Sequence, residues 1–316
     1  MWGNFLVAFN AVMPFLCYLA LGWGLVRIGW TDRPFLEKLN KLNFQAFFPF
    51  LMFYNLYSVT PENMPSARLI GMTVISVLAV IGVLLWVVPR VVAEYARRGV
   101  SIQGIFRSNF LLYGVGLTQF VYGTERAAVA SMLVVIVVSI FNISAVVVLE
   151  HYRGGGKTSP GQLLLGLAKN PLLQGCVLGL VAFAIRLRLP VFLEKPVSAL
   201  AGLATPLAMI SLGGTLQFAA LRKNRRPILA VLGIKLVALP VVMLGIAYAI
   251  GLRGVELFLV LMVYGTPVAA ASYPMAANMG GDGELAGQLV FVSTVASLGT
   301  IFGFIFVLSH LGLLGL

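Results

Sequence analysis

Ten stretches of this 316-residue chain are apolar and long enough to cross a lipid bilayer as helices, which takes about 20 residues each. They cover residues 4–28, 36–57, 67–89, 102–122, 126–150, 162–186, 195–217, 228–250, 255–278 and 284–313. Only 10% of the residues are charged, whereas a soluble domain carries about 25%. Because backbone groups in lipid must be satisfied internally, the sequence predicts an all-α integral membrane protein with ten transmembrane helices.

The second half of the sequence resembles the first at spacings of about 151 to 159 residues. Pro14 and Pro171 open similar apolar segments, and each is followed seven and eight residues later by Leu-Gly. Tyr113-Gly114 in the fourth stretch matches Tyr264-Gly265 in the ninth. We therefore expect two five-helix repeats, residues 1–150 and 162–316, joined by a cytoplasmic connector at 151–161. Such repeats are typical of secondary transporters.

Basic residues are unevenly divided between the two sets of loops, and this predicts the orientation. One set of loops holds six basic residues, and Lys235 lies inside the eighth stretch. The larger set holds fifteen: Arg27, Arg33, Lys38, Lys41, Arg90, Arg97, Arg98, Arg107, Arg153, Lys157, Lys169, Arg222, Lys223, Arg225 and Arg226. The positive-inside rule places this set in the cytoplasm and both termini outside it. Because each half has five spans, the second half is inverted. These loops also account for the net charge of +12 without nucleic acid.

Glycine and proline fall near the middle of two matching stretches, the fourth and the ninth. The fourth holds Gly114 and Gly116, and the ninth holds Gly265 and Pro267. These residues weaken helices, so we expect helices 4 and 9 to be broken and to cross at mid-membrane. Half-helices starting near Leu117 and Val268 would direct free N–H groups at one place, which favours an anion. The alternative is ordinary packing glycines and a proline kink.

Polar and flexible residues near these breaks are candidates for binding a substrate. Asn109 is favoured because it lies about two turns before Gly116, although polar groups in spans often only join neighbouring helices. Lys235 either extends to the cytoplasmic surface or adds positive charge to an anion path. The candidates are Asn109, Tyr113, Gly114, Gly116, Tyr264, Thr266, Pro267, Asn55 and Ser211.

Acidic residues are absent from the middle of every apolar stretch. Proton relays and many cation sites depend on intramembrane carboxylates, so a cation-proton antiporter is disfavoured. A neutral or anionic substrate fits better. Enzyme motifs such as a P-loop, H-E-x-x-H and G-x-S-x-G are also missing, so we expect neither an enzyme nor a metal or cofactor.

Seven stretches in order resemble the auxin efflux carrier family from end to end. They are 14–29, 39–56, Arg107-Ser108-Asn109 with Gly114, Lys169-Asn170-Pro171, 204–216, Lys235-Leu236 with Pro240, and 266–282. The resemblance implies a scaffold of helices 1, 2, 6 and 7 and a moving transport part of helices 3–5 and 8–10. It places Asn109 near a substrate carboxylate and Pro267 at the crossover. Gly116 departs from the family, which usually has proline there.

The leading hypothesis is therefore an elevator or rocking transporter in the bacterial inner membrane. Its substrates would be small organic carboxylates such as malonate, malate or auxin-like acids. A sodium-coupled symporter of the bile-acid type and a non-transporting receptor with a transporter-like fold are the alternatives. The expected partners are an organic anion and membrane lipid, with a homodimer as a further hypothesis.

Overall fold

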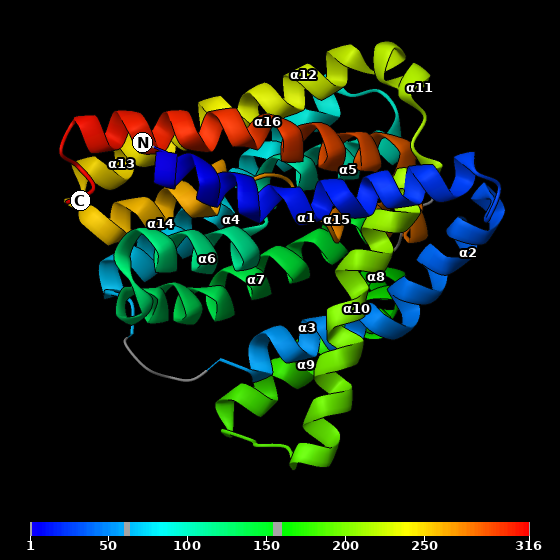
Figure 1. Cartoon of the computed structure of the whole chain (residues 1–316), viewed down its shortest axis with the longest axis horizontal. Coiled ribbons are helices and arrows are strands. Elements are labelled where there is room, and N and C mark those ends of the chain that lie inside the picture. The colour runs from blue at the N-terminus through cyan, green and yellow to red at the C-terminus, as the bar shows by residue number, and fades with distance from the viewer. Residues whose placement is uncertain (1, 60–63, 154–159, 316) are drawn as a thin grey trace.

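The computed structural model describes residues 2–59, 64–153 and 160–315, and they form a helical fold (Figure 1). The first half contains α1 (Trp2–Arg27), α2 (Arg33–Leu42), the π-helical turn η1 (Asn43–Phe47), α3 (Phe48–Tyr57), α4 (Ala67–Val91), α5 (Tyr95–Phe106), α6 (Phe110–Tyr122) and α7 (Thr124–Tyr152). The second contains α8 (Pro160–Ala168), α9 (Pro171–Ala184), α10 (Val191–Thr215), α11 (Phe218–Lys223), α12 (Arg225–Gly233), the π-helical turn η3 (Ile234–Ala238), α13 (Leu239–Ala249), α14 (Gly254–Gly265), α15 (Ser272–Asn278) and α16 (Gly283–His310).

Five continuous helical segments are long and apolar enough to cross a membrane: Ala67–Val91, Arg126–Tyr152, Val191–Thr215, Arg225–Ala249 and Gly283–His310. Several other predicted spans correspond to two shorter helices in succession, namely α2 with α3, α5 with α6, α8 with α9, and α14 with α15. Most of the predicted connector at 151–161 lies outside the described residues.

Helix boundaries follow from local side chains. Asp32 accepts a hydrogen bond from the backbone N–H of Phe35, and Asn170 accepts one from that of Leu172, so each caps the helix that follows. Asp282 caps α16 through Leu285 and also forms an ion pair with Arg97 at 2.9 Å. A cap of this kind satisfies backbone donors that the first helical turn would otherwise leave unpaired.

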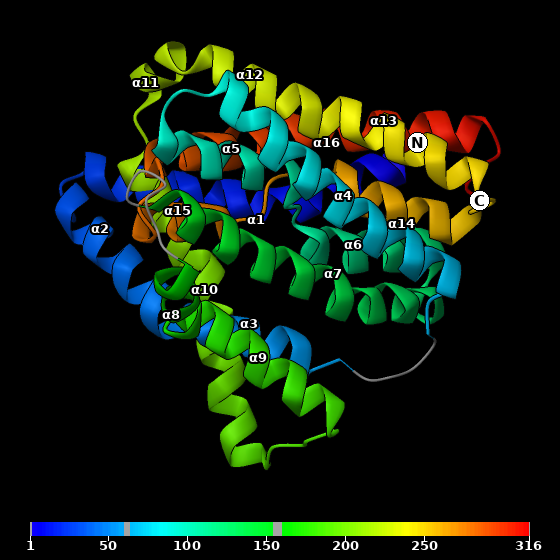
Figure 2. The ribbon, with the colours of Figure 1, turned by 180° about the vertical axis from the view of Figure 1, so that it is seen from behind.

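Glycines allow two helix pairs to pack closely. A Cβ added at Gly213 of α10 would collide with the carbonyl of Leu19 in α1. A Cβ at Gly179 of α9 would lie only 2.7 Å from the carbonyl oxygen of Phe53 in α3. Small residues let membrane helices approach backbone to backbone, so α1 packs on α10 and α3 packs on α9. Figure 2 shows α3, α9 and the lower part of α10 projecting from the remaining helices.

Two interrupted helices meet inside the molecule. Arg107 to Asn109 separates α5 from α6, and residues 266–271 separate α14 from α15. Ser108 pairs with Val268 in an antiparallel bridge. The backbone N–H of Asn109 donates to the carbonyl of Pro267 at 2.9 Å. Each break thus satisfies backbone groups of the other, which interrupted helices require when no water is present.

The predicted break at Thr266-Pro267 is confirmed, whereas the predicted break at Gly114–Gly116 is wrong. Both glycines lie inside α6, which begins at Phe110 rather than near Leu117. The helix after Pro267 begins at Ser272 rather than Val268. A glycine weakens a helix by only about 1 kcal/mol, which is too little to interrupt α6 at these positions.

Candidate substrate-binding cavity

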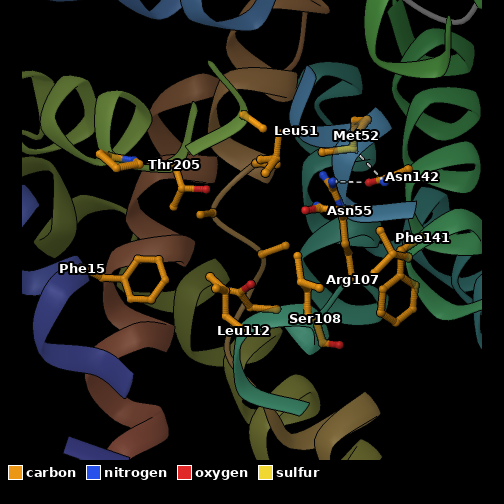
Figure 3. A pocket seen from close by; sticks show the side chains of 18 of the residues that line it. Phe15, Leu51, Met52, Asn55, Arg107, Ser108, Leu112, Phe141, Asn142 and Thr205 are labelled. Atoms are coloured by element: carbon orange, nitrogen blue, oxygen red, sulfur yellow. Dashed lines mark hydrogen bonds between the residues drawn. The ribbon is translucent and has the colours of Figure 1, made fainter. Parts of the chain in front are cut away.

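A cavity of about 450 Å³ lies beside the two breaks. It is lined by residues of α1, α3, α6, α7 and α10 and by residues of the two breaks. Figure 3 shows Phe15 and Thr205 on one side and Arg107, Ser108 and Phe141 on the other. The polar residues that line the cavity are Tyr18, Asn55, Arg107, Ser108, Asn109, Asn142 and Thr205.

Arg107 is the one charged residue among the described residues that line this cavity. It is only 2% exposed, and its guanidinium donates to Asn142 Oδ1 and to Met275 Sδ, both at 2.6 Å. A guanidinium has five N–H donors and stays protonated in proteins, and a thioether is a weak acceptor. No ion pair in the described part of the chain involves Arg107. The cavity therefore holds a buried positive charge whose counterion is not supplied by these residues.

The assignment of Arg107 to a cytoplasmic loop is therefore wrong. Helix α5 begins at Tyr95, so Arg107 lies between two helices that together span 95–122, near the middle of this length. The neighbouring Arg97 and Arg98 made it resemble part of a loop cluster. Without Arg107, the loops predicted to be cytoplasmic hold fourteen basic residues, and the opposite loops hold six.

Asn142 of α7 holds the Arg107 side chain in place. Its Oδ1 accepts from the guanidinium, and its Nδ2 lies 2.8 Å from Met52 Sδ of α3 (Figure 3). Asn142 is 2% exposed and Met52 is also buried. An amide fixed on both sides restricts the rotamers of the arginine, so less conformational entropy is lost when a ligand binds.

Asn55 and Asn109 are the two sequence-predicted candidates that line the cavity. Asn109 is fixed by its backbone, which donates to Pro267 and accepts from Tyr113. Its side chain is partly exposed and does not cap α6. The hydroxyl of neighbouring Ser108 is buried and has no hydrogen-bond partner among the described residues. Ser108 and Asn109, which carry neutral hydrogen-bond donors, therefore directly follow Arg107 in the sequence.

The other seven candidates are not among the residues that line this cavity. Tyr264 is hydrogen-bonded to Ser76, and Thr266 donates to the carbonyl of Met262. Pro267 contributes its carbonyl to the contact with Asn109. Gly116 is exposed, and a Cβ there would meet nothing within 4 Å. The remaining candidates, Tyr113, Gly114 and Ser211, are buried in the helix packing.

Lys235 does not extend to the surface, contrary to one of the two interpretations of the sequence. The residue is 0% exposed, and its Nζ has no hydrogen-bond partner among the described residues. It lies in η3, which packs against α5, α14 and α16. It is not among the residues that line the cavity.

Comparison with known proteins shows the family of the chain. The family described as membrane transport protein matches residues 7–305 of the chain. The chain belongs to the auxin efflux carrier family of membrane transport proteins. It is therefore a multi-pass membrane protein and a transporter.

Two relatives align with nearly the whole chain. One is an "Uncharacterized transporter" of Methanothermobacter thermautotrophicus, 26% identical over 298 residues, which cover 93% of this chain and 96% of the relative. The other is a "Putative malonate transporter" of Rhizobium meliloti, 25% identical over 311 residues, covering 94% of each.

Proposed function

We propose that this protein is a secondary transporter of small organic carboxylate anions. The observation that carries the proposal is Arg107, a guanidinium buried in the cavity wall without an acidic partner among the described residues. An isolated buried charge is costly, and a bound anion would remove that cost. The planar fork of arginine also matches the two oxygens of a carboxylate. The name of the Rhizobium relative points to the same ligand class.

The cavity is a poor site for a sodium ion. None of the described residues that line it is an aspartate or glutamate, and its one charge is positive. Sodium and similar hard cations prefer oxygen ligands and are repelled by a neighbouring guanidinium. We therefore favour a sodium-independent carrier over a symporter of the bile-acid type.

The packing supports a scaffold of α1–α3 and α8–α10 and a transport part of α4–α7 and α11–α16. The contacts α1–α10 and α3–α9 are equivalent under the proposed inverted repeat, since α1 matches α9 and α3 matches part of α10. The cavity lies between these two parts. Alternating access would then arise when the transport part moves against the scaffold by an elevator or rocking motion.

The proposed location is the bacterial inner membrane, with both termini outside the cytoplasm. Figure 1 shows the N- and C-terminal ends at the same end of the molecule. The fourteen basic residues against six give the direction by the positive-inside rule. The two breaks would then cross near mid-membrane.

Uptake into proteoliposomes tests the function. Purified protein is reconstituted, and uptake of labelled mono- and dicarboxylates is measured with sodium and with choline as the external cation. We expect saturable uptake of a carboxylate that is unchanged by replacing sodium. Strict sodium dependence would favour the symporter, and binding without flux would favour a receptor.

A further inference from the structure

We propose that the cavity selects monoanions, in which one carboxylate is attached to an apolar body, over dicarboxylate dianions. This inference rests on the proposed function and narrows the substrate class of the same site. It differs from what the name of the Rhizobium relative would lead one to expect, because malonate carries two carboxylates.

The first argument is the number of charges. Arg107 can neutralise one carboxylate through its fork of N–H donors. No other arginine, lysine or histidine is among the described residues that line the cavity. Lys235, which is also buried, lies outside that lining. A second ionised carboxylate would therefore enter the cavity without a cationic partner.

The second argument is the chemistry of the remaining wall. Away from Arg107 the lining is mainly apolar and includes Phe15, Leu51, Leu111 and Phe141. An unpaired carboxylate placed against such side chains loses its hydration and gains no equivalent bond. An alkyl or aromatic group placed there gains free energy from the apolar area that it removes from water.

The third argument is size and position. About 450 Å³ corresponds to the liquid volume of about fifteen water molecules, so a short diacid would leave much of the apolar wall unfilled. The hydrogen bonds to Asn142 and Met275 hold the guanidinium at one side of the cavity. Figure 3 shows Thr205 of α10 on the side opposite Arg107. A ligand whose carboxylate contacts Arg107 would thus extend its other end toward α10.

Ligand binding to purified wild-type protein, measured by isothermal titration calorimetry at neutral pH, tests the inference. Malonate is compared with its monomethyl ester, which keeps the skeleton and removes one charge, and phenylacetate adds a larger apolar body. We expect the monoester to bind at least about tenfold more tightly than malonate, and phenylacetate more tightly still. Malonate binding as tight as that of the monoester would overturn the inference.

A variant with a second cation provides an independent check. Thr205→Lys should raise the affinity for malonate relative to the monoester by at least about tenfold. Thr205→Val, which matches the threonine in shape without adding charge, is the control and should not raise the affinity for malonate relative to the monoester. An unchanged preference in a folded Thr205→Lys protein would contradict the inference, and if that variant does not fold, the wild-type titrations decide.

The outcomes also separate this inference from the proposed function. If no carboxylate binds to folded wild-type protein, the proposed function itself fails. If dicarboxylates bind best and Arg107→Gln abolishes that binding, the carboxylate function stands and only the selection for monoanions is wrong.

Discussion

The backbone N–H of Asn109 donates to the carbonyl of Pro267 at 2.9 Å, and this bond joins interrupted helices from opposite halves of the chain. It fixes the backbone two residues after Arg107, which lines the cavity. The bridge between Ser108 and Val268 also pairs the two breaks, and the backbone N–H of Val268 donates to Ser293 Oγ of α16. The interruption therefore places a charged side chain in the interior without leaving the break unsupported.

Replacing Arg107 with glutamine should abolish carboxylate binding while leaving the protein folded. Truncating one partner of a buried charge pair costs about 2–5 kcal/mol of binding, which corresponds to a loss of at least about 30-fold in affinity. Without ligand, the variant should be at least as stable as wild-type protein, because the substitution removes a buried charge that has no counterion among the described residues. Calorimetric titration and thermal unfolding measure the two effects. Arg107→Lys, which keeps the charge but loses the fork, should retain partial affinity.

Asn109→Ala should impair transport and leave folding intact, because Asn109 lines the cavity and its structural bond uses the backbone. Loss of one hydrogen bond to a carboxylate costs about 1–3 kcal/mol. Ser211→Ala is the matched control, since the buried Ser211 hydroxyl has no hydrogen-bond partner among the described residues and does not line the cavity. Uptake by Asn109→Ala equal to that of Ser211→Ala would show that Asn109 has no role in binding.

Asn142→Leu should raise the KM for uptake by about tenfold or more, with a smaller change in kcat, because Arg107 loses the partner that orients it. Its effect should not add to that of Arg107→Gln, since both act through the same guanidinium. Initial rates of the two single variants and the double variant give this comparison. Full additivity would mean that Asn142 acts independently of Arg107.

Gly116→Leu should leave transport close to the wild-type level. A break at Gly114–Gly116, as the sequence predicts, would lead one to expect that a leucine at Gly116 crowds the site. The structure reverses this expectation, because Gly116 is exposed and a Cβ there meets nothing within 4 Å. Gly213→Leu should instead disrupt the α1–α10 contact and lower the yield of folded protein. Uptake assays and size-exclusion profiles of both variants test these two expectations. A Gly116→Leu protein that is folded but fully inactive would contradict the assignment of the cavity.

Cysteine labelling tests the orientation. Lys223 and Arg188 are both exposed and belong to loops predicted to lie on opposite sides of the membrane. In intact cells, an impermeant thiol reagent should label Arg188→Cys but not Lys223→Cys, each in a background that lacks Cys17 and Cys176. The reverse pattern would mean that the positive-inside rule gives the wrong direction here.

The sequence predicted the helical class and the break at Pro267. These depend on local signals: apolar length, the proline that removes a backbone donor, and the offset between the halves. Arg107 was missed because its break contains neither glycine nor proline. What interrupts the helix is pairing with the distant segment at Val268, which no local propensity encodes.

The internal repeat contained a usable signal for this site. Most of its matches have an offset of 157 to 159 residues, which places the counterpart of Pro267 near Ser108. The Tyr-Gly match at an offset of 151 instead predicts a break at Gly114. The hydrogen bonds of Arg107 to Asn142 and Met275 join α7 and α15, so their geometry depends on tertiary packing.

The most direct test of the account is counterflow in proteoliposomes loaded with an unlabelled monocarboxylate and placed in a trace of the labelled compound. Wild-type protein should accumulate label transiently without sodium, and Arg107→Gln at equal reconstituted amount should not. Equal accumulation by the two proteins would contradict the central role of the buried guanidinium. The absence of exchange by wild-type protein for every carboxylate tested would contradict the proposed function.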